Sequence, residues 1–550
     1  MATRSKSLVA VGSIVALAAV SSPAWAQRIA EPAYFASTTG SGARALGMGG
    51  AFIAIADDAT ASSWNPAGLC VLERAEASLV FQPLAKVTTK YTSNEFGLLT
   101  RSNLTGGFVS TNAELENSDP YDLSRDSRSF DFASVTVPLR LGGLKVVPQL
   151  SYQRQVDMGL DYSYRTAYQD TIARETRNPA GAVSSTVLDT GGGSYRGDGE
   201  LGGGLDVIGL SSGIGFSSKL YLGLALNLWR NGSNAHTTYG FDRNATNQGI
   251  SGTLPTSGSS TQNYSEDRTV TEDFTGTNFQ VGILAKPKSW LSVGATYKSG
   301  FDMDYEYQFD GTTVNVFRTV SGSGSTAVTS EDTNRTQSSS SRTGTIRWPA
   351  SVGGGIAVMP KETLTFSVDA TLIQWSKGHL VASGVSQSQL TRTNVRTVGS
   401  GSPSTTNTTN PPSSGTFDQN FSWPVYMPGI QEKQPDALQV RLGAEYVLRN
   451  PGFLNVQVLP LRVGLVRDRQ LVKDYQSDTD VYYTGVTTGL GLTWSRLSLD
   501  LAYLFTRGSR SEDYATFTET ATSRTDREQD LSGKTGYRSS RFFVSTTVRF

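Results

Sequence analysis

Few residues in this chain have side chains suited to covalent or metal chemistry. The 550 residues include two histidines, His236 and His379, and one cysteine, Cys70. A Ser-His hydrolase needs a histidine beside its nucleophile, but both histidines fall in polar stretches that we expect to be loops. No Cys/His spacing typical of a zinc site occurs, and no Gly-rich run has the strand-to-helix context of a phosphate loop. The sequence therefore predicts no enzyme, no metal site and no cofactor.

Charged residues inside strand-like stretches form a second group of candidates. Each of them alternates with apolar neighbours, which puts it on the face opposite the apolar one. The group consists of Arg441, Arg462, Glu445, Asp369 and Asp500. Charges of both signs on one face usually form structural networks, which is what we expect here. An arginine among them could also hold a carboxylate ligand by a paired hydrogen bond.

These charges belong to segments that alternate with a period of two, the signature of β-strands. The alternation is clearest in residues 220–228, 364–373, 438–448, 497–506 and 542–550. A soluble sandwich would bury the apolar face of such strands against a second sheet. A barrel in lipid would turn it outward and place the polar face in the lumen.

The lengths of the connections favour the barrel. Short turns alternate with long polar connections, as in outer-membrane barrels with turns in the periplasm and loops outside. We therefore predict an all-β, transmembrane antiparallel barrel of about fourteen strands. The strands are predicted at 75–86, 129–140, 144–156, 203–216, 218–230, 274–286, 289–302, 346–359, 363–376, 436–448, 457–469, 482–494, 497–508 and 538–550, and the long loops at 87–128, 157–202, 231–273, 303–345 and 377–435.

Composition and the N-terminal region agree with export to the outer membrane. The hydrophobic fraction is 37%, and 48 basic residues balance 48 acidic ones, so nothing indicates a nucleic-acid partner. A positive start, a short apolar run and Ala24-Trp25-Ala26 predict a signal peptide over residues 1–26. We expect the barrel over 75–550 and, in its lumen, a plug-like hatch over 27–74.

Tryptophans near predicted strand ends could form the aromatic girdles that mark the membrane interfaces of barrels. They are Trp229, Trp290, Trp348, Trp375, Trp423 and Trp494. For any single one of them, isolated packing within the protein is the alternative.

The N-terminal region resembles the FadL family of outer-membrane transporters, which includes TodX-type transporters of aromatic hydrocarbons. The resemblance rests on Gly-Ala-Arg-Ala-Leu-Gly-Met-Gly-Gly-Ala at 42–51, Ala-Asp-Asp-Ala-Thr at 56–60 and, above all, Asn65-Pro66-Ala67-Gly68-Leu69. It implies a fourteen-strand barrel whose hatch carries the Asn-Pro-Ala signature. Asn65, Pro66, Ala67 and Gly68 would then hold the hatch in shape.

The resemblance also implies passive uptake of hydrophobic molecules, such as long-chain fatty acids or aromatic hydrocarbons, by a monomer in contact with outer-membrane lipid. In the family, substrate leaves sideways through a gap at a kinked third strand, and here Pro148 lies in the predicted third strand. Pro148 could mark the kink or be an ordinary rim proline. Two other functions stay open: a PorV-type scaffold barrel for secreted proteins and a general diffusion porin.

Overall fold

The structure is a computed structural model. It describes residues 40–550 except 105–106, 116–120, 158–159, 178–182, 251–257, 322–326, 423–434, 475–476 and 514–525. The predicted signal peptide, the first part of the predicted hatch and Trp423 lie outside the described residues.

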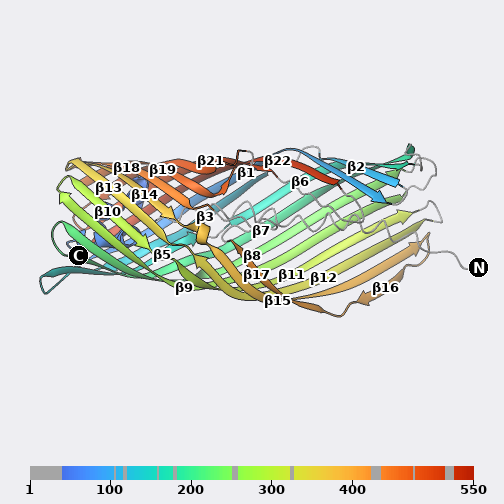
Figure 1. The fold of residues 1–550 in the computed structure, drawn as a ribbon, viewed down its shortest axis with the longest axis horizontal. Helices are drawn as coiled ribbons and strands as arrows, with labels where there is room; N and C mark the ends of the chain where they lie inside the picture. Colours follow the sequence, from blue (N-terminus) through green and yellow to red (C-terminus); the bar gives the residue numbers. More distant parts are fainter. Residues whose placement is uncertain are drawn as a thin grey trace, which may run out of the picture.

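The described part is an antiparallel sheet that closes on itself (Figure 1). Its strands are β1 (Glu76–Leu104), β2 (Gly107–Leu115), β3 (Tyr121–Thr136), β4 (Leu139–Leu141), β5 (Leu144–Asp157), β6 (Leu160–Arg177), β7 (Val183–Gly215), β8 (Leu220–Ile250), β9 (Gly258–Lys288), β10 (Leu291–Lys298), β11 (Phe301–Ser321), β12 (Val328–Trp348), β13 (Ser351–Lys361), β14 (Leu364–Ile373), β15 (His379–Val398), β16 (Ser404–Thr409), β17 (Ser413–Ser422), β18 (Ala437–Arg449), β19 (Val458–Lys473), β20 (Asp480–Thr493), β21 (Leu497–Asp513) and β22 (Asp526–Arg549).

Fourteen of these strands form the closed ring at the end with the short turns, which confirms the predicted number. The order around the ring is β1-β3-β5-β7-β8-β9-β10-β13-β14-β18-β19-β20-β21-β22. Pairing of Glu76 with Arg549 joins the last strand to the first. Closure leaves no free sheet edge, which a barrel in lipid requires.

The predicted long loops are largely wrong, because many of these stretches continue as paired strands. β8 and β9 pair from Leu220 and Ala285 out to Gly249 and Gly258, and β11 pairs with β12 over its whole length. These outer parts are rich in Ser, Thr, Asn and Gly, and most of them lack an apolar face, so their alternation is invisible in the sequence although the backbone ladder needs no apolar residues. The start of β11 is an exception, because Met303, Tyr305 and Tyr307 alternate with acidic and polar residues.

Three ring strands are interrupted where the wall passes into this outer extension. β10 continues as β11 across Ser299-Gly300, β12 continues as β13 across Pro349-Ala350, and β14 continues as β15 across a short 3-10 turn, η3 (Trp375–Lys377). The predicted strands 289–302 and 346–359 each span such an interruption, whereas the predicted strand 363–376 ends at the third one, before β15.

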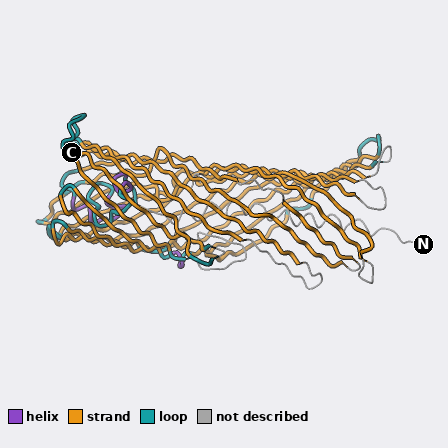
Figure 2. The backbone as a smooth tube through the Cα atoms, turned by 90° about the horizontal axis from the view of Figure 1, so that it is seen from above, coloured by secondary structure: helices purple, strands orange, loops and turns teal. Residues whose placement is uncertain are grey.

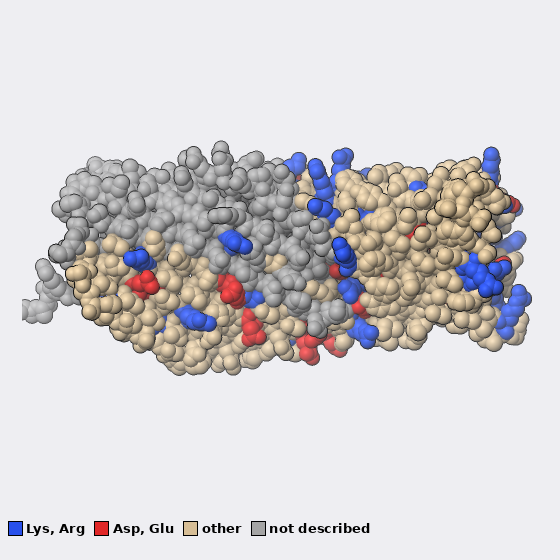
Figure 3. Space-filling model, turned by 180° about the vertical axis from the view of Figure 1, so that it is seen from behind, with Lys and Arg blue, Asp and Glu red and all other residues tan. Residues whose placement is uncertain are grey.

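Side chains alternate between the two faces of the wall as predicted. Leu224, Leu226 and Leu228 of β8 are exposed on the outside, whereas Gly223 and Ala225 are buried. The same holds in β18, where Leu442 is exposed and Arg441 is buried. Figure 3 shows the outer belt as a largely uncharged zone between the Lys and Arg side chains at one rim and the charges near the middle of the molecule.

The N-terminal segment lies inside the barrel near the short-turn end (Figure 2). It contains two short helices, α3 (Ala43–Gly47) and α4 (Ala61–Trp64), and the 3-10 helix η1 (Pro66–Val71). Nearly all of its residues are buried, with Phe52, Asn65 and Leu69 at 0% exposure. Among the described residues, no helix has the length and apolar character needed to cross a membrane.

Candidate transport site in the barrel lumen

Inward-facing glycines of the wall make room for the N-terminal segment, which we call the hatch segment (residues 40–72). A side chain at Gly223 would overlap the backbone of Pro66 and Ala67, and one at Gly464 would overlap Met48 and Gly49. The same close approach recurs at Gly213, Gly282, Gly294, Gly355, Gly443 and Gly489. Several of these glycines are direct neighbours across strands, such as Gly213 with Gly223 and Gly443 with Gly464. These glycines therefore form a recess in the inner face of the wall, here called the glycine seat, which has room for the backbone of the hatch segment.

Asn65 is the centre of the hatch segment's hydrogen bonding. Its Oδ1 accepts from the amide of Ala67 at 3.1 Å and so caps η1. Its Nδ2 donates to the carbonyl oxygens of Ile53 and of Ile283 in β9, both at 2.9 Å. Pro66 occupies the first position of η1, where a backbone N–H would have no partner within the helix, so its absence removes no hydrogen bond. These contacts connect Asn65 to two parts of the hatch segment and to the wall, and the role of Asn65 and Pro66 in holding the hatch in shape stays a prediction.

Ala67 and Gly68 complete the motif by being small. Ala67 packs against Gly223, and a side chain at Gly68 would collide with the carbonyl group of Ala56. Both residues are fully buried. A larger side chain at Ala67 would push η1 away from the wall, and one at Gly68 would push it away from Ala56 within the hatch segment.

Side chains of the wall bond to the backbone of the hatch segment around most of the ring. Asp369 accepts from the amide of Ile53 at 2.7 Å, and Thr487 accepts from the amide of Gly49 at 2.9 Å. Ser292 donates to the carbonyl of Ala54 at 2.6 Å. A backbone without its own sheet or long helix needs such partners, since buried N–H and C=O groups are costly when unpaired.

One cluster of charges ties the hatch segment to the wall. Arg44 lies 2.6 Å from Asp57 and 3.3 Å from Glu445, and Glu445 in turn accepts from Arg462 at 2.7 Å. Arg462 also donates to Asp500 at 2.6 Å. Burial alone would lower the pKa of Arg44, but Asp57, Glu445 and Asp58 hold it well above its ordinary value. Arg462, Glu445 and Asp500 are thus brought together as a network.

The remaining predicted lumen charges are also buried and bonded. Arg441 pairs with Asp468 through both ends of its guanidinium group. Asp369 accepts from the Ile53 amide of the hatch segment, and its Oδ1 has no hydrogen-bond partner in the part of the chain that the structure describes. The predicted arginines therefore already have carboxylate partners within the protein.

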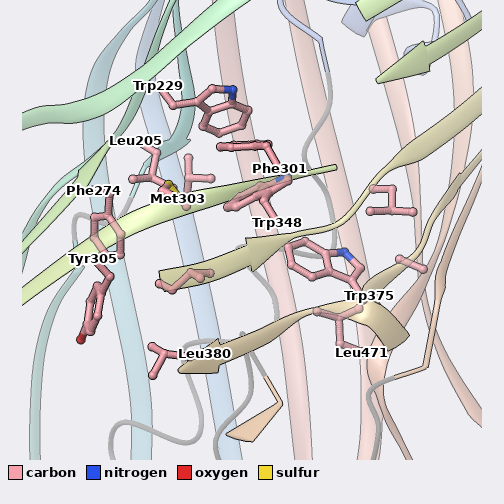
Figure 4. Close-up of a cluster of buried hydrophobic side chains, with 14 of the residues drawn as sticks. Leu205, Trp229, Phe274, Phe301, Met303, Tyr305, Trp348, Trp375, Leu380 and Leu471 are labelled. Atoms are coloured by element: carbon pink, nitrogen blue, oxygen red, sulfur yellow. The ribbon is translucent and has the colours of Figure 1, made fainter. Parts of the chain in front are cut away.

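A cluster of buried aromatic residues fills part of the lumen where the three strands are interrupted (Figure 4). The ring centroid of Trp348 is 4.9 Å from that of Trp229 and 5.3 Å from that of Trp375, and Phe301 lies 5.3 Å from Trp229. The girdle prediction is wrong for Trp229, Trp348 and Trp375, because they face inward. Only their positions near strand ends suggested an interface. Trp290 is exposed at the rim, as a girdle residue would be.

Between the hatch segment and this cluster lies a cavity, which we call the chamber. Its lining includes Trp64 of α4, Trp229, Trp348, Ile373 and the charged Lys298 at the end of β10. This cavity is partly open to solvent. Sequence reasoning missed Lys298, since it stands beside an aromatic and before the Ser299-Gly300 interruption with no motif around it.

Within the described ranges, the Nζ of Lys298 donates one hydrogen bond, to the carbonyl oxygen of Ser63 at 3.4 Å. Among the described residues, no acidic side chain pairs with it. Asp369 and Arg441 also line the chamber but are already bonded to the hatch segment and to Asp468. Lys298 is therefore a cation whose charge the described protein leaves uncompensated.

Among the described residues, the shortest ladder between neighbouring strands of the ring joins β3 and β5. Their ladder runs only from Phe132↔Gln153 to Thr136↔Gln149. Between β5 and β7 the register shifts between Arg154 and Val156, so that Gln155 is an extra residue. Gln155 lines the chamber and also a second cavity, which includes Ser129 and Asp131. The inner lumen is thus next to the place where the wall is least paired.

Pro148 lies in β5 between the short turn at Gly142-Gly143 and the register shift at Gln155. It is paired with Ser212 in an unbroken stretch of the β5–β7 ladder, and its carbonyl accepts from the amide of Val137 at 3.2 Å. The break on the neighbouring strand falls at Val137-Pro138, between β3 and β4. The structure therefore puts the bulge of the third strand at Gln155, and a role for Pro148 in transport stays a prediction.

The residues considered for covalent chemistry lie apart from the chamber lining. Cys70 is buried in η1, and burial raises the pKa of its thiol to about 11. His379 is exposed at the start of β15, and His236 falls within β8, so the expectation that both lie in loops is wrong. Within the described ranges, no group of three or more His, Cys, Asp or Glu residues could hold a metal ion.

Comparison with known proteins identifies a family and similar solved structures. Residues 15–447 match the sequence model of a family described as outer membrane protein transport protein (OMPP1/FadL/TodX). Similar solved structures include a Pseudomonas aeruginosa FadL homologue, with 12% identity, TM-score 0.47 and coverage of 94% of this chain and 99% of that chain. The P. putida toluene transporter TodX shows 14% identity, TM-score 0.42 and coverage of 94% and 99%.

None of the curated proteins matches the chain. The family match, however, covers more than half of its length and includes the Asn65-Pro66-Ala67 motif. The chain belongs to the FadL/TodX family of outer-membrane transporters for hydrophobic compounds, which is a transporter and channel family.

Proposed function

We propose that this protein, acting as a monomer, takes up hydrophobic molecules that carry an acidic head group, such as long-chain fatty acids, by passive transport. The observation that carries the proposal is the chamber. Its lining is mixed, but Trp64, Trp229, Trp348 and Ile373 offer apolar surface to an apolar chain, and Lys298 supplies a positive charge beside them. A carboxylate beside Lys298 would compensate a charge that is costly to hold away from water.

The lumen arginines are poorer candidates for this role than the sequence suggested. Arg441 and Arg462 already bond to Asp468, Glu445 and Asp500. A ligand carboxylate would have to displace one of these partners and leave it buried without a counter-charge. Lys298 needs no such exchange.

We further propose that substrate leaves sideways between β3 and β5. The short ladder there and the extra residue Gln155 support this route, since fewer backbone hydrogen bonds have to open. Apolar Phe130 and Leu150 are exposed on the outer surface beside the ladder. Release into lipid would spare an apolar solute contact with the aqueous periplasm.

Aromatic hydrocarbons are the second candidate substrates. Solved relatives are described as toluene transporters and as a monoaromatic hydrocarbon channel. Trp229, Trp348 and Phe301 offer the ring faces and edges with which such a solute would pack. A neutral hydrocarbon would gain nothing from Lys298, which separates the two substrate classes experimentally.

The test compares uptake of labelled oleate and labelled toluene in cells that carry the parent protein or Lys298→Met. Lys288→Met, at an exposed turn of the same sheet, is the matched control. We expect the Lys298 variant to lose roughly tenfold or more of its oleate uptake, since a charge-assisted hydrogen bond contributes about 1.5–3 kcal/mol. Toluene uptake should not change.

Equal oleate uptake by both variants would refute the role of Lys298. Swelling of protein-containing liposomes in solutions of small sugars tests the porin alternative, because a porin would let these sugars through. If neither solute enters faster than in cells lacking the protein, a PorV-type scaffold becomes the better explanation. A protein captured on the outer extension would then support it.

A second pair of variants tests lateral release. Deleting Gln155 would remove the extra residue and let the β5–β7 register run on unbroken. Uptake should fall, whereas sugar permeability should not change. Pro148→Val lies in a continuous part of the ladder; if it lowers uptake and the Gln155 deletion does not, the kink belongs at Pro148.

A further inference from the structure

The hairpin of β4 and the start of β5 extends past the end of the neighbouring strand β1. Thr136 is the last residue of the outgoing arm that pairs with β1, opposite Glu76, whereas the returning arm stays paired with β7 as far as Lys145. The arm that follows Thr136 extends for five more residues, to Leu141, which is about 16 Å along a strand. In that stretch, the ladder of β4 is with β5 alone among the described residues.

One face of this hairpin is entirely apolar. Alternate residues of the outgoing arm, Val137, Leu139 and Leu141, are exposed, and Leu144 follows on the returning arm. The register places Leu139 opposite Val146 and Leu141 opposite Leu144, so these side chains share a face. A turn at Gly142-Gly143, with positive φ at both residues and open space around them, closes the hairpin.

This face continues the lipid-facing belt. Val135 on β3 and Leu150 on β5 are exposed at 57% and 55% on the same face, directly before and after the hairpin. An apolar strip of this kind in water would be unfavourable. Its continuity with the belt indicates that lipid covers it.

The rim around the hairpin is positively charged. The short turns and the strand ends beside them carry six cations, against the acidic Glu73 and Glu362. The cations are Lys219, Lys286, Lys288, Lys361, Arg449 and Arg496. Glu362 is already paired with Arg449 at 3.0 Å. Figure 3 shows Lys and Arg side chains gathered at this end of the molecule. Arg140 and Lys145 add two cations on the other face of the hairpin.

We propose that the β4–β5 hairpin anchors the barrel in the periplasmic leaflet of the outer membrane. Its apolar face lies against acyl chains, and the cationic rim binds the phosphate groups of anionic phospholipids. Apolar contact and charge together give stable membrane binding where either alone is weak. The inference depends on the barrel's place in the membrane and not on the substrate proposed above.

The test places a fluorescent label on the hairpin of the full-length protein in vesicles. In a Cys70→Ser background, Leu141→Cys carries the label. Leu210→Cys on the lipid-facing belt and Thr406→Cys on β16 are the positive and negative controls. Vesicles of phosphatidylethanolamine, with and without phosphatidylglycerol, contain lipids brominated on their chains, which quench a label only on contact. Heat-modified mobility on gels verifies that each variant is folded.

We expect the Leu141 label to lose most of its emission, as the Leu210 label does, and the Thr406 label to keep its own. Quenching at Leu141 should increase with phosphatidylglycerol, and the combined variant Lys219→Gln, Lys361→Gln, Arg496→Gln should remove that increase. A Leu141 label that brominated lipid leaves bright would overturn the proposal. Protection from both brominated lipid and aqueous iodide would overturn it in favour of a protein partner on the hairpin.

Discussion

Replacing Asn65 by alanine should loosen the hatch segment from the barrel without unfolding the barrel. The substitution removes three hydrogen bonds. One is donated by the Ala67 amide to Oδ1 of Asn65, and two are donated by its Nδ2 to the carbonyl oxygens of Ile53 and Ile283. Asn65 is fully buried, so water does not replace these bonds without rearrangement. The contacts at the glycine seat and at Arg44 remain.

The magnitude follows from those three bonds. Each contributes about 0.5–1.5 kcal/mol net, and an orphaned buried group costs about 1–3 kcal/mol. We therefore expect the free energy of detaching the hatch segment to fall by about 2–4 kcal/mol. That corresponds to amide exchange in the hatch segment that is roughly thirty to several hundred times faster, at about 1.4 kcal/mol per tenfold change.

Hydrogen exchange followed by mass spectrometry on peptides of residues 40–72 measures this change, and ion conductance in planar bilayers provides a functional readout. Asn227→Ala is the matched control, because Asn227 bonds to Asn278 in the wall and not to the hatch segment. Exchange should accelerate in the hatch peptides and not in β18 or β19. Unchanged exchange in the Asn65 variant would refute the view that this side chain holds the hatch segment in place.

Three further perturbations have defined outcomes. Gly464→Val should prevent the hatch segment from seating and raise ion conductance, because its side chain would overlap Gly49, whereas Gly354→Val, where the space is open, should behave like the parent protein. Trp348→Ala should lower the free energy of unfolding by about 3–5 kcal/mol through loss of its packing with Trp229 and Trp375, which thermal denaturation in detergent can measure; an unchanged midpoint would contradict the packing. Asp474 lies in the outer connection between β19 and β20, and the Ser511 amide, which donates to it at 2.6 Å, lowers its pKa. The contribution of this carboxylate to stability is therefore present above the unfolded pKa of about 3.9 and lost as the pH falls through the lower folded pKa. Hydrogen exchange of the Ser511 amide should accelerate on acidification, and in Asp474→Asn it should be fast already at neutral pH.

The alternation of apolar and polar residues and the lengths of the connections were sufficient to predict much of the architecture. Alternation in residues 220–228 and 438–448 indicated which side chains face lipid, and both segments are strands with that orientation. Short and long connections indicated a barrel with two different ends. The prediction of loops was wrong for most of the outer stretches because a strand with no apolar face leaves no period of two in hydrophobicity, although its backbone still pairs with its neighbours. At the start of β11 this reason does not apply, since the alternation of Met303, Tyr305 and Tyr307 with polar residues is present in the sequence.

The sequence by itself determined the barrel class, the number of strands in its ring and the family, because these depend on local periodicity and on the contiguous Asn65-Pro66-Ala67 motif. Only the tertiary structure decided that Trp229, Trp348 and Trp375 meet in the lumen, and that Lys298 stands without an acidic partner among the described residues. It also decided that the extra residue of the third strand is Gln155. These features depend on the register between strands distant in sequence, and that register is fixed only when the sheet closes around the hatch segment.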